Sequence, residues 1–293
     1  MMYQSGAAFR RALEDRLLAE SQQAHVPLVR LRKMVAFDRF LARLVQAHPD
    51  QWLLKGGLAL QLRLGMRART TLDVDVLLLA PATQQYLMLV QAAGLDLKDW
   101  FEFTVRATTA QLWGAGGSGK RFAVTALLDG RTFEAFHLDV GIGDPVIELA
   151  DQLVTPPLLA FAGIPAATFP CYPVTQHLAE KMHAYVRPRA TAANTRVKDL
   201  VDILLIAEQV RVNASALCAA ITATFAAAGE IQLPNSLPDP PSSWTATFRR
   251  MAADVGLAID DLSSAIATAR QFLDPVLEGQ AHGTWRPDAR TWG

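Results

Sequence analysis

Cysteine is nearly absent from the sequence, which has only two among its 293 residues, Cys171 and Cys218. Two cysteines exclude the disulfide frameworks that stabilise many small secreted proteins. Long apolar runs are absent as well, since no stretch approaches the ~20 residues that a membrane-spanning helix needs. The first residues, MMYQSGAAFRRALEDR, have no apolar core before their charges, unlike a secretory signal. These absences predict a cytoplasmic protein with no membrane partner.

An excess of charge of one sign is also lacking, because 28 Lys and Arg balance 28 Asp and Glu. The balance is uneven along the chain. Residues 1–70 have 12 basic and 5 acidic residues, residues 71–155 have 5 and 11, and residues 156–293 have 11 and 12. This pattern is consistent with a cluster of carboxylates that binds a cation beside a basic surface that binds anions. It is equally consistent with chance variation of charge along the sequence.

The order of apolar patterns predicts the fold class. Short strand patterns gather between residues 50 and 145, and helical periodicity dominates elsewhere. Asp129-Gly130 between two apolar runs predicts a hairpin. Four prolines between residues 156 and 170 mark a change of composition. We expect an α+β protein, with N-terminal helices and a sheet core in residues 1–155 and a mainly helical domain in residues 156–293.

A helix expected from about Pro27 to His48 has a basic face. That face has five cations, Arg30, Arg32, Lys33, Arg39 and Arg43. They form either an ordinary solvated face or a surface that follows the phosphates of a nucleic acid. With an RNA substrate, the basic segment from Arg187 to Lys198 would follow the same backbone.

A Gly-Gly pair stands between a short strand pattern, residues 52–55, and a helical run, residues 58–64. Glycines at such a place let the backbone approach a ligand closely. The helix start then directs free N–H groups at an anion. Gly56 and Gly57 are therefore candidate anion-binding residues, or simply a turn.

Two carboxylates on one face of an apolar strand predict a metal site. Asp73 and Asp75 stand two residues apart in TLDVDVLLL, so their side chains share a face. Burying two such charges without a partner costs several kcal/mol per ion, roughly. Either a divalent cation removes that cost, because Mg²⁺ prefers carboxylate oxygens, or the strand lies at an edge of the sheet and exposes both aspartates to water. Asp139, on a strand that can lie beside the first, completes the ligand set of a two-metal phosphoryl-transfer site.

The segment from residue 176 to 207 combines cations with buried acids. Lys181 lies on a predicted helix beside apolar residues, where it either extends to solvent or neutralises a triphosphate. Asp199 and Asp202 share a face of a helix that is apolar almost all round. Such a helix is buried, so its aspartates need partners, for which Lys181 and Arg196 are candidates. Alternatively, they merely favour the first turns of the helix.

GAGGSGKR, from Gly114 to Arg121, nearly matches a nucleotide-binding P-loop. Arg121 stands where that motif has the Ser or Thr that reaches Mg²⁺, and the next residues read as a strand rather than a helix. We expect a hairpin loop here.

Taken in order, four motifs resemble the AbiEii/MenT nucleotidyltransferase toxins, a family of the DNA polymerase β-like nucleotidyltransferase superfamily. The segments are LLKGGLAL, RTTLDVDV, HLDVG and AEKMHAYVR followed by RVKDLVDI. Leu58 departs from the pattern, since the residue after the second glycine often has a hydroxyl group in the family.

The resemblance implies a mixed sheet flanked by helices, a helical C-terminal part, and Mg²⁺-dependent or Mn²⁺-dependent transfer of NMP from an NTP. It implies a toxin of a type IV, abortive-infection-like toxin–antitoxin pair, with a cognate antitoxin and the tRNA 3′ end or another RNA as acceptor. By matched position, the metal ligands are Asp73, Asp75 and Asp139. The catalytic residues are these three with Lys181 and Asp202. The nucleotide-binding residues are Lys55, Gly56, Gly57, Thr71, Lys181, Arg196 and Asp199.

Two other functions stay open at this point. One is a nucleotidyltransferase that modifies a small molecule such as an antibiotic, which would lack the steep salt dependence of RNA binding. The other is a catalytically silent nucleotide-binding module. The sequence does not decide the preferred NTP, the acceptor, the oligomeric state, or whether Asp199 or Asp202 is the functional acid of the last motif.

Overall fold

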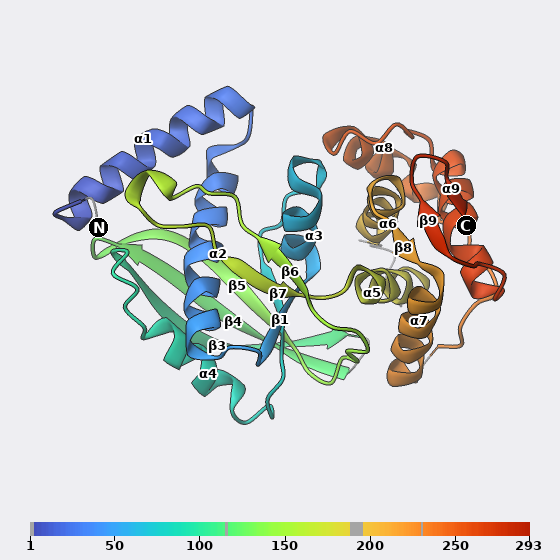
Figure 1. The fold of residues 1–293 in the computed structure, drawn as a ribbon, viewed down its shortest axis with the longest axis horizontal. Coiled ribbons are helices and arrows are strands. Elements are labelled where there is room, and N and C mark those ends of the chain that lie inside the picture. Colours follow the sequence, from blue (N-terminus) through green and yellow to red (C-terminus); the bar gives the residue numbers. More distant parts are fainter. Residues whose placement is uncertain (1–2, 115–116, 188–195, 230) are drawn as a thin grey trace.

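The computed structural model describes residues 3–114, 117–187, 196–229 and 231–293. Figure 1 shows a part built on a sheet at one side of the molecule and a group of helices at the other. The helices are α1 (Gly6–Ala24), α2 (Leu28–Ala47), α3 (Gly56–Leu64), α4 (Gln85–Ala93), α5 (Val174–Val186), α6 (Val197–Gln209), α7 (Ala214–Ala228), α8 (Thr245–Asp254) and α9 (Leu262–Leu277). Within the described part of the chain, no helix is long and apolar enough to cross a membrane.

The main sheet has seven strands in the order β3-β4-β5-β2-β1-β7-β6. These strands are β1 (Trp52–Lys55), β2 (Val74–Leu78), β3 (Phe101–Gly114), β4 (Gly117–Leu128), β5 (Arg131–Gly141), β6 (Asp151–Val154) and β7 (Thr168–Cys171). Strand β2 is parallel to β5, and β1 is parallel to β7, whereas the other neighbours are antiparallel. The expected mixed sheet flanked by helices is confirmed. Strands β8 (Val212–Asn213), β9 (Thr284–Arg286) and β10 (Thr291–Trp292) form a small second sheet in the helical part.

The hairpin predicted at Asp129-Gly130 is confirmed. Both residues have positive φ, 54° and 68°, which is what a tight hairpin turn requires. The loop expected at residues 114–119 is mostly strand, since β3 runs to Gly114 and β4 begins at Gly117, while residues 115–116 lie outside the described residues. Arg121 lies within β4, so no helix follows the glycine-rich segment and a P-loop is excluded.

Among the described residues, two large hydrophobic cores hold the chain together, and a small third cluster joins Leu53, Leu77 and Tyr172. The first joins α1, α2 and the sheet, and it extends to Phe169 and Cys171 on β7. The second is built from α5 to α9 together with Leu60 and Leu64 of α3. The sheet and the first core thus continue beyond residue 155, because β7 pairs with β1. The division of the chain into two domains at residue 155 stays a prediction, and most buried apolar residues from Leu178 onward belong to the second core.

The basic face expected on residues 27–48 is largely internal, because its cations have partners within the protein. Arg43 is fully buried and bonds both carboxylate oxygens of Asp99. Arg39 is also buried and contacts Asp38 and Asp99. The interpretation of this helix as a surface for RNA phosphates is therefore wrong for Arg39 and Arg43.

Candidate active site

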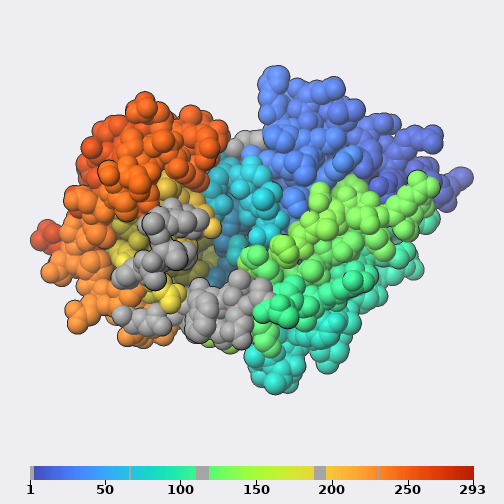
Figure 2. Space-filling view, turned by 180° about the vertical axis from the view of Figure 1, so that it is seen from behind, coloured from blue at the N-terminus to red at the C-terminus, as the bar shows by residue number. Residues whose placement is uncertain are grey.

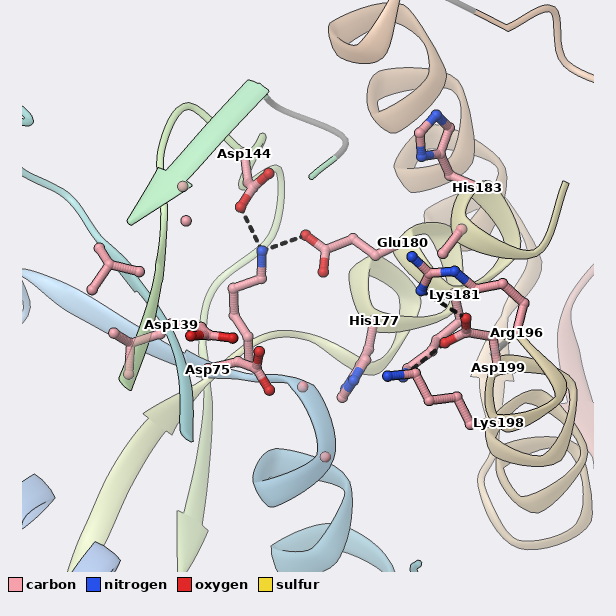
Figure 3. Close-up of a pocket in the computed structure, with 18 of the residues that line it drawn as sticks. Asp75, Asp139, Asp144, His177, Glu180, Lys181, His183, Arg196, Lys198 and Asp199 are labelled. Atoms are coloured by element: carbon pink, nitrogen blue, oxygen red, sulfur yellow. Dashed lines mark hydrogen bonds and ion pairs between the residues drawn. The ribbon is translucent and has the colours of Figure 1, made fainter. Parts of the chain in front are cut away.

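A cavity of about 400 Å³ lies between the sheet and the helices α5 and α6. In Figure 2 the surface between the helical part and the sheet is hollowed, and the yellow chain of α5 lies at its floor. One wall is formed by β1, β2, β5 and the start of α3, and the opposite wall by α5 and the start of α6. Figure 3 shows acidic side chains of the sheet on one side of this space and basic side chains of the helices on the other.

Asp75 and Asp139 lie side by side on the sheet wall. They are register partners on the parallel strands β2 and β5, so both side chains are on one face. Within the described residues, the Asp75 carboxylate has no hydrogen bond or ion pair. Burial raises the pKa of Asp75, and the charge of Asp139 raises it further. An unpartnered carboxylate beside a second one is a donor set that fits a divalent cation.

Asp73 lies just before β2, which begins at Val74, and it does not line the cavity. Its carboxylate lies 3.4 Å from His137 Nδ1 and 3.4 Å from Arg121 Nη2. Arg121 also donates two hydrogen bonds of 2.7 Å to Asp139. Among the residues that the structure describes, no three His, Cys, Asp or Glu side chains are arranged to hold one metal ion. The three-carboxylate metal site therefore stays a prediction, and its members surround Arg121.

The glycine pair brings the start of α3 against these residues. Gly56 has a φ of 62°, and a Cβ on it would collide with the Asp75 carboxylate. A Cβ on Gly57 would lie 2.9 Å from the Cβ of Thr71. No side chain caps the N-terminus of α3, and both glycines line the cavity. The backbone N–H groups at this helix start are therefore available to an anion.

The helical wall is organised around Lys181. Its ammonium group lies 3.1 Å from Asp199 and 2.7 Å from Asp202. Burial alone would lower the pKa of Lys181, but the two carboxylates raise it, so the lysine is charged. Arg196 binds Asp199 at 3.0 Å, and Arg69 binds Asp202 at 3.0 Å. The prediction that Lys181 and Arg196 partner the two aspartates is confirmed, and Arg69 is an additional partner.

The two aspartates differ in their access to the cavity. Asp199 lines it, whereas Asp202 is fully buried and does not. Burial would raise the pKa of Asp202, but Lys181 and Arg69 hold it below its ordinary value. Asp202 is therefore an ionised anchor for two cations. It reaches a substrate only through them.

Lys198 lines the cavity, whereas the sequence analysis placed it only at the end of the segment expected to follow an RNA backbone. It has no ion pair within the described part of the chain. Burial lowers the pKa of Lys198, and the neighbouring charge of Arg69 lowers it further. A cation crowded by other cations is stabilised by an incoming anion. Its place in RVKD, at the start of a buried helix, is the only signal in the sequence that points to it.

Lys55 has carboxylate partners that the sequence did not reveal. Its Nζ lies 2.5 Å from Asp144 and 2.7 Å from Glu180 (Figure 3), and it also lies 4.7 Å from the centre of the Tyr172 ring. Burial alone would lower the pKa of Lys55, but Glu180 and Asp144 raise it. Because Glu180 belongs to α5, this ion pair links the sheet to the helical part.

Two further side chains complete the description of the site. Thr71 donates a hydrogen bond of 3.0 Å to the backbone of Asp73 and does not line the cavity. His177 lines the cavity, is buried, and has no hydrogen-bond partner at either ring nitrogen among the described residues. Burial and the charge of Lys181 lower the pKa of His177 well below its ordinary value, so the ring is neutral. Arg189 and the rest of residues 188–195, expected to follow an RNA backbone, lie outside the described residues.

Comparisons with known proteins were made for sequence and for structure. A family model described as "Nucleotidyl transferase AbiEii toxin, Type IV TA system" matches residues 39–275. The structure is similar to MenT4, a nucleotidyltransferase toxin from Mycobacterium tuberculosis H37Rv, with a TM-score of 0.54 and 17% identity over 92% of this chain and 98% of that one.

Two solved structures from Helicobacter pylori are also similar. One is a putative nucleotidyltransferase, with a TM-score of 0.47 and 13% identity over 85% of this chain and 98% of that one. The other is JHP933, with a TM-score of 0.46 and 15% identity over 85% of this chain and 94% of that one. No curated protein matches the sequence.

Proposed function

Because the chain belongs to the AbiEii family of type IV toxin nucleotidyltransferases, we propose that it transfers NMP from an NTP to an RNA acceptor, with Mg²⁺ or Mn²⁺ as the cation. The tRNA 3′ end is the acceptor we propose, and the cytoplasm is where NTP and tRNA are found together. Membership of the family also implies an antitoxin partner. The observation that carries the proposal is the Asp75 carboxylate, which no described residue bonds, beside Asp139 and facing the cations of α5 and α6 across the cavity.

The sheet wall would hold the cation. Asp75 and Asp139 are its proposed ligands, with Asp73 as a third once it leaves Arg121. A bound divalent cation supplies charge stabilisation and aligns the reacting groups in phosphoryl transfer. Asp139 lines the cavity. It either completes this ligand set or accepts the proton of the acceptor hydroxyl.

The opposite wall and the start of α3 would hold the triphosphate. The N–H groups at Gly56 and Gly57 direct donors at the cavity, and Lys181 and Lys198 add positive charge. Ion pairs with Asp199 and Asp202 hold Lys181 in position. Arg196, which pairs with Asp199, adds further positive charge beside it. Holding the phosphates between two walls orients the α-phosphate for attack and reduces the entropy lost on reaching the transition state. Lys55 and Thr71 act as positioning residues in this scheme, since their polar atoms bond other protein groups.

A small-molecule acceptor is the second candidate, and one observation favours it. Arg39 and Arg43 of α2 are buried in ion pairs, so this helix offers less positive surface to RNA than its sequence indicates. The two candidates differ in salt dependence, because RNA binding that neutralises several phosphates weakens steeply with added salt. Binding of tRNA measured at several salt concentrations separates them.

The test is incubation of the full chain with total RNA and each α-³²P-labelled NTP in turn. We expect label on RNA, and a loss of at least about 100-fold in rate for Asp75→Asn, because the proposed cation loses a ligand at the reacting phosphate. Asp288→Asn, which changes an exposed aspartate far along the chain, is the matched control and should keep the rate. An Asp75→Asn protein that labels RNA at the wild-type rate would refute the assignment.

A further inference from the structure

Arg121 contacts two of the three carboxylates that are proposed to hold a metal ion, and Asp139 lies between it and the third, Asp75. Its guanidinium group donates two hydrogen bonds of 2.7 Å to the two oxygens of Asp139. The same group lies 3.4 Å from Asp73. The charge of Asp75 also acts on Arg121. One cation of the chain thus contacts two of the side chains that are proposed to hold a metal ion and is attracted by the charge of the third.

The sheet fixes this arrangement. Arg121 on β4 and Asp139 on β5 are register partners in an antiparallel pair, so their side chains meet directly. The two hydrogen bonds form a bidentate contact between the guanidinium and the carboxylate, which is stronger and more specific than a single hydrogen bond. Asp75 is the next partner of Asp139, on the opposite side of β5. Asp139 therefore stands between a cation and an unpartnered carboxylate.

A divalent cation at Asp75 and Asp139 competes with Arg121. Both Asp139 oxygens already accept hydrogen bonds from the guanidinium. A metal ion would need at least one of those oxygens, and its charge would repel the guanidinium at short range. The Arg121 side chain is 29% exposed, so it has solvent into which to move.

We propose that Arg121 is an internal counter-cation, which neutralises Asp139 and Asp73 in the metal-free protein and must leave Asp139 when a divalent cation binds. Arg121 thereby sets the metal affinity of the site. The inference rests on the proposed function, because it takes Asp75 and Asp139 as the metal ligands. A purely structural cross-strand pair would affect the stability of the sheet and leave metal affinity unchanged.

The experiment is titration of the full chain with Mn²⁺. Binding is measured by calorimetry and by the loss of the electron paramagnetic resonance signal of free Mn²⁺. Arg121→Gln removes the competing cation, and we expect its Kd to be about 10-fold lower than that of the wild type, the change that corresponds to about 1.4 kcal/mol. Arg121→Lys keeps the charge but loses the bidentate contact, so its Kd should lie between the two. Arg106→Gln removes an exposed cation from the neighbouring strand β3 and should bind within about threefold of the wild type.

A second readout uses stability. Without metal, Arg121→Gln leaves the carboxylates unneutralised, so its Tm should be lower than that of the wild type. The rise in Tm at the same high Mn²⁺ concentration should be larger for the variant, because the stabilisation by a ligand grows with the logarithm of its concentration divided by its Kd. Circular dichroism shows whether each variant is folded. If Arg121→Gln does not fold, the comparison is made with Arg121→Lys.

The outcomes separate this inference from the proposed function. Equal Kd values for the wild type and Arg121→Gln, or weaker binding by the variant, overturn the role of Arg121 and leave the nucleotidyltransferase site intact. Mn²⁺ binding that survives Asp75→Asn unchanged, or no binding by either chain, overturns the metal ligands and with them the inference. Tighter binding by Arg121→Gln that is lost in the double variant with Asp75→Asn supports both.

Discussion

At the scale of single residues, the site depends on one position where a side chain is missing. Gly56 has a positive φ and lies so close to Asp75 that any Cβ would collide with the carboxylate. The glycine therefore does two things, since it permits the turn from β1 into α3 and leaves room for Asp75 at the cavity. The sequence predicted the close approach to a ligand, and the structure adds that the first neighbour is an acidic side chain of the same protein.

Gly56→Ala should lose activity out of proportion to its loss of stability. Its natural control is Gly163→Ala, because Gly163 also has a positive φ, 74°, but has nothing within 4 Å of the added Cβ. Alanine at a left-handed position costs about 1–2 kcal/mol, so we expect a loss of that size in the control, with normal activity. Gly56→Ala should lose more stability, and Mn²⁺ affinity or NMP transfer should fall at least about 10-fold, because Asp75 is displaced. Urea unfolding and the labelling reaction measure these effects. Full activity in Gly56→Ala would show that Asp75 does not need this space.

At the scale of elements, α2 shows how a charge pattern misleads when its partners are distant in sequence. Arg43 contacts Asp99, and the two residues are 56 positions apart. It also donates to the backbone oxygens of Leu95 and Phe101 and lies over the ring of Phe103. No local pattern reveals these contacts, so a buried ion pair and a solvated basic face look the same in the sequence.

The two kinds of cation on α2 should differ in their contribution to stability. Arg43→Ala removes the two hydrogen bonds between Arg43 and the buried Asp99 and leaves that carboxylate with the longer contact to Arg39, so we expect the free energy of unfolding to fall by about 3–5 kcal/mol. Arg32→Ala removes a more exposed pair with Glu14 and should cost less than about 1 kcal/mol. Urea unfolding of both variants measures the difference. If Arg43→Ala cost as little as Arg32→Ala, α2 would not be fixed to the sheet by this ion pair.

The elements that the sequence predicted are those with strong local signals. The hairpin at Asp129-Gly130 and the apolar helix around Leu200 to Ile206 are confirmed, because turn residues and apolar periodicity specify them locally. The strand predicted in TLDVDVLLL is confirmed for Val74–Leu78, whereas Asp73 lies before it. Strands β6 and β7 were missed, since each has four residues and β7 contains Pro170. Apolar periodicity in the C-terminal part predicts a last long helix over Ala258–Leu277, but α9 begins at Leu262, where Asp261 caps it, and the same periodicity does not reveal the separate helix α8.

The same limit applies to the candidate site. The sequence predicted the partners of Asp199 and Asp202, because a buried apolar helix cannot leave acids unpaired. It did not predict Arg121, Asp144 or Glu180, whose roles arise from strand pairing and from contact between the two parts of the chain. Spacing within one element reveals which side chains share a face, whereas contacts between elements require the fold.

At the scale of the whole molecule, the cavity lies between two hydrophobic cores, and α3 belongs to both. Leu58 packs in the core of the sheet, whereas Leu60 packs in the core of the helices. The ion pairs Lys55–Glu180 and Arg69–Asp202 add further links across the same boundary. Helix α3 thus fixes the two walls of the site relative to each other, and its own N-terminus lines the cavity.

This sharing predicts that the two cores unfold together. Leu58→Ala and Leu60→Ala remove the same group from one helix, each from a different core, and each should cost about 2–5 kcal/mol. If α3 couples the cores, either variant should speed hydrogen exchange both in β5 of the sheet and in α6 of the helical part, measured by mass spectrometry of peptides under native conditions. Independent cores would respond separately, with Leu58→Ala affecting only β5 and Leu60→Ala only α6. In that case the sheet and the helices would be free to move apart, and the distance between Asp75 and Lys181 would be set by the substrate rather than by the fold.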